Sequence, residues 1–147
     1  MPASAPGPAP GLPLVSDYAA LAGAQSPAGL IVFDRAHAAQ WLNEAARSML
    51  EVDGLEPAAA QASIRSRLFD DAGRPVTPTT SPVGHVLRTG LPSPAVALAI
   101  RNHDNSARWF EVSARPTVGA SGALEAVVLA FVDVDAARIA LSTQNAP

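Results

Sequence analysis

Three histidines are the side chains of this sequence best suited to proton transfer or metal binding near neutral pH. His37 and His103 lie in segments that are typical of turns, where water solvates them. His85 lies in an expected helix, beside the apolar face that Val83 and Val86 form there. The spacing of the histidines matches no known pattern of metal ligands. They therefore predict neither a metal site nor a catalytic pair.

The carboxylates offer no better candidate for catalysis. Asp70 and Asp71 stand in a turn, and Asp133 and Asp135 stand at the end of the last expected strand. A general acid or base needs a positioned partner, and the sequence indicates none beside them. A nucleophile elbow and a glycine-rich phosphate loop are also missing. We therefore predict that this chain is not an enzyme.

Composition and charge argue against several further classes of function. The 147 residues are 48% hydrophobic, carry a net charge of −3 and include no cysteine. Without a basic stripe the chain is not expected to bind nucleic acid or a membrane surface. Without cysteine it has no disulfides, thiolate metal sites or cysteine-dependent flavin photochemistry. No apolar stretch could span a bilayer and prolines oppose a secretory signal, so we expect one cytoplasmic domain.

The first half of the chain alternates helix and strand signals. A disordered segment rich in proline and alanine is expected over residues 1–15. The elements expected next are a short helix with Tyr18 and Leu21 on one face, strands over Gly29–Phe33 and Gln40–Leu42, and a helix over Glu44–Leu50. Asn43 stands where it can cap that last helix.

The second half changes from helical to strand periodicity. Its expected elements are a helical stretch over Pro57–Leu68, a loop over Asp70–Pro82, a helix from Ser81 to Gly90, and strands over Ala95–Ile100, Trp109–Arg115 and Leu124–Val132. Three consecutive strands should form an antiparallel meander. The pattern predicts an α+β fold: a five-stranded antiparallel sheet with short helices on one face and an N-terminal helix.

The last expected strand is apolar on both faces, which predicts that both are buried. The short helices can cover only one face of the sheet. Either the helix around Tyr18 and Leu21 or a second subunit must cover the other. Trp109 shares that outer face with polar residues of its strand. We therefore expect a homodimer whose interface includes Tyr18, Leu21 and Trp109.

Several motifs together resemble the PAS domains of bacterial signalling proteins. They are Ser26–Asp34, Trp41–Ala46, Asp71–Pro75, Pro82–Gly90, Arg108–Pro116 and Phe131–Asp135. The resemblance implies a sensory domain over residues 16–135 and a linker or tail over 136–147. Asp135 stands where the closing signature of the family has threonine.

The resemblance also implies a mechanism. A small, mainly apolar ligand would lie between the sheet and the helices. The residues expected to contact it are Leu68, Val86, Leu98, Phe110 and Val112 as walls, with Asn43, His85 and Arg88 as polar anchors. Asp133 and Asp135 would relay the signal to a C-terminal or separate effector, of the histidine kinase or cyclic-di-GMP enzyme type.

Alternatives stay open at this level. The preferred interpretation of Asn43 is a helix cap, and contact with a ligand is the alternative. No cofactor is expected, although haem bound through His85, or a flavin, is an alternative. The chain could also be a ligand-free dimerisation module with a self-filled interior. A cone-shaped α+β fold like that of the NTF2 proteins is the rival architecture.

Overall fold

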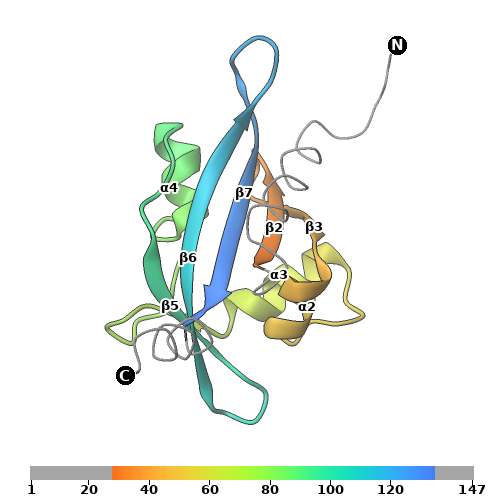
Figure 1. Ribbon diagram of the computed structural model, residues 1–147, viewed down its shortest axis with the longest axis vertical. Coiled ribbons are helices and arrows are strands. Elements are labelled where there is room, and N and C mark those ends of the chain that lie inside the picture. Colours follow the sequence, from red (N-terminus) through yellow and green to blue (C-terminus); the bar gives the residue numbers. More distant parts are fainter. Residues whose placement is uncertain (1–27, 135–147) are drawn as a thin grey trace, which may run out of the picture.

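The computed structural model describes residues 28–134, and these form one sheet with three helices (Figure 1). In chain order the elements are β2 (Gly29–Asp34), β3 (Ala39–Leu42), α2 (Glu44–Met49), α3 (Pro57–Arg65), β4 (Leu68–Phe69), α4 (Pro82–Thr89), β5 (Val96–Arg101), β6 (Ala107–Val118) and β7 (Leu124–Asp133). Two strands, a helical insertion and a three-stranded meander follow one another, as the sequence predicts.

The sheet has the strand order β3-β2-β7-β6-β5-β4, and every neighbouring pair is antiparallel. The first hairpin and the C-terminal meander therefore meet through β2 and β7, which are far apart in sequence. The long β6–β7 hairpin dominates Figure 1. It turns at Gly122, whose φ of 83° suits glycine better than any other residue. The α+β class and the antiparallel sheet are confirmed.

The structure has a sixth strand, β4, which the sequence pattern assigns to the end of a helix. Helix α3 ends at Arg65, and Leu68 then pairs with Ile100 of β5. The carboxylate of Asp70 accepts the backbone N–H groups of Ala72 and Arg74, which closes a tight turn after β4. A strand of two residues is too short to show a periodicity in the sequence. Nothing therefore marked the true end of the helix, and the predicted helix over Pro57–Leu68 is three residues too long.

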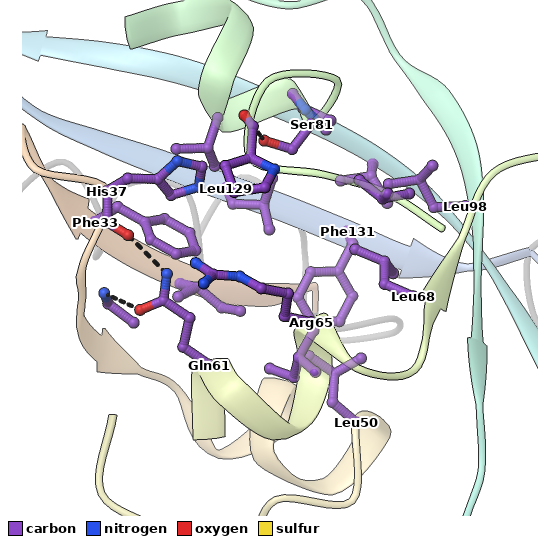
Figure 2. Close-up of a pocket in the computed structure, with 18 of the residues that line it drawn as sticks. Phe33, His37, Leu50, Gln61, Arg65, Leu68, Ser81, Leu98, Leu129 and Phe131 are labelled. Atoms are coloured by element: carbon purple, nitrogen blue, oxygen red, sulfur yellow. Dashed lines mark hydrogen bonds between the residues drawn. The ribbon is translucent and has the colours of Figure 1, made fainter. Parts of the chain in front are cut away.

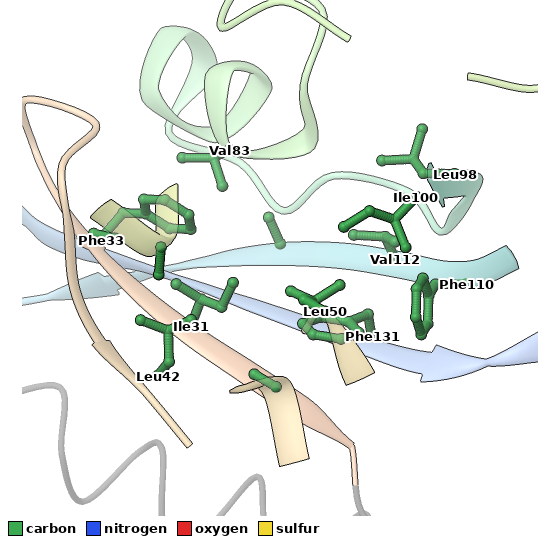
Figure 3. Close-up of a cluster of buried hydrophobic side chains, with 14 of the residues drawn as sticks. Ile31, Phe33, Leu42, Leu50, Val83, Leu98, Ile100, Phe110, Val112 and Phe131 are labelled. Carbon is green, nitrogen blue, oxygen red and sulfur yellow. The ribbon is translucent and has the colours of Figure 1, made fainter. Parts of the chain in front are cut away.

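One face of the sheet carries the main core (Figure 3). Alternate strand residues such as Ile31, Phe110 and Phe131 point to this face and are almost wholly buried. The helices contribute small side chains, including Ala46 from α2 and Ala60 from α3, both 0% exposed. Small residues let the helices approach the sheet closely, which sets the space that remains between the two layers.

The opposite face carries a second apolar cluster. Leu30 and Val32 of β2 lie beside Val128 of β7, together with partly buried neighbours on β7. Val127 and Val128 point to opposite faces and both are fully buried, so the prediction that β7 is buried on both faces is confirmed. The expected N-terminal helix with Tyr18 and Leu21, the disordered segment over 1–15 and the tail over 136–147 lie outside the described residues.

Candidate functional site

A cavity of about 100 Å³ lies between the inner face of the sheet and the helices. Its wall is almost entirely apolar, with side chains from the strands, from α3 and α4, and from the connecting loops. Ile31, Phe33 and Phe131 line the sheet side, and Ile64 and Val83 line the helix side. Figure 2 shows Phe33 and Phe131 among the lining side chains. The arrangement can enclose a small apolar body and shield it from water.

Four of the expected wall residues line this cavity. They are Leu68, Leu98, Phe110 and Val112. The ring of Phe110 packs edge-on against Phe131, with 5.2 Å between the ring centroids. Val86, expected as a fifth wall residue, is 0% exposed but contributes to the core beside the cavity and not to its lining. Leu98, Phe110 and Val112 come from strands that the periodicity predicts, whereas Ile31, Phe33 and Phe131 were not among the expected wall residues.

Asn43 lies outside the cavity lining and is occupied by structural bonds. Its side-chain oxygen accepts the N–H of Ala46, which caps α2, and also the N–H of Leu30 at 3.0 Å. Its amide nitrogen donates to the carbonyl oxygen of Ala28. Asn43 thus fastens the start of α2 to β2, in agreement with its interpretation as a helix cap.

His85 and Arg88, the other two expected anchors, lie on α4 and also do not line the cavity. Arg88 is exposed, and its guanidinium donates to the backbone carbonyl of Thr79. His85 is half-buried beside the apolar face of the helix, as its helical phase predicts. Neither residue is placed to hold a molecule inside the cavity.

Three polar side chains of the lining lie near one another: His37, expected as a solvated turn residue, and Gln61 and Arg65, which the sequence pattern does not single out. Arg65 is exposed to solvent, and we call this side of the cavity its mouth. The side chain of Gln61 bridges two elements, because it donates to the carbonyl oxygen of His37 and accepts the N–H of Ala39. In Figure 2 Arg65 extends from α3 toward the side of the cavity where His37 and Gln61 lie. The mouth is therefore the polar end of an apolar pocket.

His37 lies in a turn, as predicted, but is half-buried instead of fully solvated. Its ring stands edge-on to Phe33, with 5.5 Å between the centroids. Burial lowers the pKa of His37 below 6.5; the nearby charge of Arg65 lowers it further, and Asp34 opposes both. At neutral pH the ring is therefore uncharged, and Arg65 carries the positive charge of the mouth.

The mouth residues carry a signal that sequence reasoning missed. Gln61, Ile64 and Arg65 are spaced three and four residues apart, so they share one face of α3. In the sequence, such a face looks like the ordinary boundary between the buried and the exposed side of a surface helix. Only the packing of α3 across the hairpin β2–β3 makes it the rim of a cavity.

The end of β7 is fixed by an ion pair. Asp133 accepts a hydrogen bond from the guanidinium of Arg108 at 2.6 Å, and Arg108 also reaches the carbonyl oxygen of Met49. This joins β7, β6 and α2 at one point. Trp109, next along β6, is partly buried. Asp135, the second expected relay residue, lies outside the described residues.

Residues 28–134 give no sign of a metal site or of a membrane span. No group of three or more histidine, aspartate or glutamate side chains in this range is placed to bind a metal ion. Among the helices of the same range, none is both long and apolar enough to cross a membrane.

No protein-family model and no curated protein matches this sequence. Solved structures do match its fold. A domain of a putative light and redox sensing histidine kinase from Haloarcula marismortui aligns with a TM-score of 0.55 and 14% identity, over 78% of this chain and 94% of that one. A PAS domain from Colwellia psychrerythraea aligns with a TM-score of 0.52 and 14% identity, over 81% and 96%.

A third neighbour is a light-oxygen-voltage domain studied with a flavin analogue. It aligns with a TM-score of 0.56 and 17% identity, over 90% of this chain and 93% of that one. At such identities the shared property is the fold, including the curled antiparallel sheet with short helices against one face.

Proposed function

Because the chain has the PAS fold, we propose that it is a sensory domain that binds a small, mainly apolar molecule and relays the binding event to an effector. The observation that carries the proposal is the apolar cavity between the sheet and the helices. Protein interiors are close-packed, so an apolar space of this size between the two layers supports a binding role. The neighbour from a histidine kinase supports a sensory role for domains of this fold.

The cavity limits the class of ligand. Its volume of about 100 Å³ is below the range of about 300 to 1,000 Å³ that sites for drug-sized molecules occupy. A flavin or a haem is larger than this space, so either would require the helices to move away from the sheet; one structural neighbour is a light-oxygen-voltage domain studied with a flavin analogue. His85 also lies outside the lining, so it offers no axial ligand within the cavity. A compact ligand with few polar atoms is the best match.

Relay would run through β7 and a homodimer. Leu129 and Phe131 of β7 line the cavity, and Asp133 at the end of the same strand is paired with Arg108. A ligand that displaces Phe131 would therefore strain the point where β7 leaves the sheet. We propose that Asp133 and Asp135 pass this change onward, in a cytoplasmic homodimer whose interface includes Tyr18, Leu21 and Trp109.

A cavity-filling variant tests whether a ligand binds here. Val83 is 2% exposed and lines the cavity from α4, so Val83→Phe should fill part of it. Wild-type protein should gain thermal stability from some member of a panel of small apolar molecules, by about 2.7 kcal/mol at 100 times the Kd. Val83→Phe should lose that gain, at an overpacking cost of about 1–3 kcal/mol.

The matched control is Val118→Phe, the same substitution at a β6 residue that is 61% exposed and does not line the cavity. It should keep the full ligand-induced gain. A gain that survives in Val83→Phe would place the binding site elsewhere. No gain in the wild-type protein with any compound would favour the ligand-free dimerisation module instead.

A further inference from the structure

The cavity combines an apolar interior with one unmatched positive charge at its mouth. Arg65 lines the mouth, and within residues 28–134 no carboxylate forms an ion pair with its guanidinium. Gln61 and Ser81, two further polar residues of the lining, are engaged by the protein itself. Gln61 bridges two backbone groups, and the hydroxyl of Ser81 both accepts from Gly84 and donates to the carbonyl of Pro78.

Asp34 is the acidic side chain that acts on the ring of His37, but it forms no ion pair with Arg65. Its carboxylate accepts hydrogen bonds from its own turn and hairpin instead. One of its oxygens accepts the backbone N–H groups of Ala36 and Ala38, and the other accepts the side chain of Gln40. Arg65 is therefore available to a negatively charged group that enters the mouth.

We propose that the ligand of this cavity is a small apolar carboxylate, whose apolar body fills the interior and whose carboxylate group pairs with Arg65 at the mouth. This inference rests on the proposed function and specifies its ligand class. A guanidinium presents two parallel N–H donors that match the two oxygens of a carboxylate. One permanent positive charge beside a neutral His37 suits a monovalent anion better than a more highly charged one.

The volume of the cavity limits how large the apolar part of the ligand can be. An apolar protein cavity of about 150 Å³ binds benzene. A cavity of about 100 Å³ therefore suits a short aliphatic chain or a single ring. Hexanoate and benzoate are suitable probes, and 1-hexanol and benzyl alcohol are uncharged counterparts with similar bodies.

Isothermal titration calorimetry of the full chain with these four probes tests the proposal. Hexanoate or benzoate should bind the wild-type protein about tenfold or more tightly than its alcohol counterpart, because a hydrogen bond to a charged group is stronger than a neutral one. Arg65→Gln should remove this preference and leave the alcohol affinity within about twofold. Arg65→Lys should restore part of it, since lysine keeps the charge without the planar fork.

The matched control is Arg35→Gln, which removes the same charge from an exposed turn residue outside the cavity lining. It should keep the preference for the carboxylates. Equal binding of acid and alcohol in the wild-type protein, or an unchanged preference in Arg65→Gln, would overturn the carboxylate proposal and leave an apolar site standing. If none of the four probes binds, the proposed ligand-binding function fails together with it.

Discussion

His37 joins the backbone geometry of the β2–β3 turn to the chemistry of the cavity mouth. Its φ of 67° lies in the left-handed region, which histidine and asparagine enter more readily than most residues. Its backbone carbonyl accepts a hydrogen bond from Gln61, which fixes the backbone of this turn against α3. A half-buried ring beside Arg65 resists protonation, so acidification lowers the free energy of unfolding.

The first prediction concerns this pH dependence of the protein's stability. The pKa of His37 lies below 6.5 in the folded protein, so between 6.5 and the lowered value the unfolded chain binds more protons. Acidification through this window should therefore destabilise the protein, and the loss should be complete below the lowered pKa. His37→Asn keeps the turn conformation without a titrating ring, so it should lose less free energy of unfolding over the same window. Urea titrations at a series of pH values measure this difference, and identical pH profiles for both proteins would contradict it.

At the scale of elements, helix α4 and the loop before it form one side of the cavity. Gly84 in α4 faces the backbone of that loop, and a Cβ at this position would lie 2.0 Å from the carbonyl oxygen of Pro78. The hydroxyl of Ser81 caps the helix through the N–H of the same glycine. The absence of a side chain at Gly84 therefore sets how closely α4 approaches the loop that carries Thr77 and Pro78.

The second prediction is that Gly84→Ala destabilises the protein although alanine favours helices by about 1 kcal/mol. Relief of the clash must move backbone, so the expected net loss is about 1–3 kcal/mol, with weaker ligand binding. Gly119→Ala is the matched control, since its Cβ would meet only the end of the Glu125 side chain, which can rotate away. Thermal unfolding compares the two. A loss in Gly119→Ala equal to that in Gly84→Ala would refute the packing argument.

Some strands and helices of this fold can be predicted from the sequence, and others cannot. The β-strands with four or more residues show strand patterns, and α4 has a serine cap, a proline start and Gly90 at its end. Strand β4 could not be predicted, because two residues paired only through β5 carry no pattern of their own. At the site, Leu98, Phe110 and Val112 follow from strand periodicity and from the resemblance to PAS domains, and Leu68 from the resemblance alone. Arg65 stands at the boundary between the buried and the exposed side of α3, and only tertiary packing places it at the mouth of the cavity.

At the scale of the whole molecule, the two faces of the sheet have different chemistry. The inner face holds the cavity, and the outer face holds the cluster of Leu30, Val32 and Val128 at one side and the polar residues of β6 at the other. Trp109 adds a large, partly buried side chain to β6. Tryptophan is among the residues that contribute most of the binding energy in protein interfaces.

The third prediction is that the full chain is a homodimer at tens of micromolar and that Trp109→Glu shifts it to monomer, because a charge would be buried in the interface. Leu91→Glu, at an apolar residue that is 62% exposed, should leave the dimer intact. Sedimentation velocity distinguishes these states. A wild-type monomer at high micromolar concentration would contradict the dimer, while ligand binding in the cavity would remain a separate question.

The measurement that most directly tests the central claim is a methyl NMR titration of the full chain with hexanoate. The methyl groups of Leu68, Leu98, Val112 and Leu129 line the cavity from different strands, whereas those of Val118 lie on the exposed surface. The account predicts saturable shifts at the four lining residues and none at Val118. Unchanged lining resonances at saturating hexanoate, or shifts confined to surface methyl groups, would contradict it.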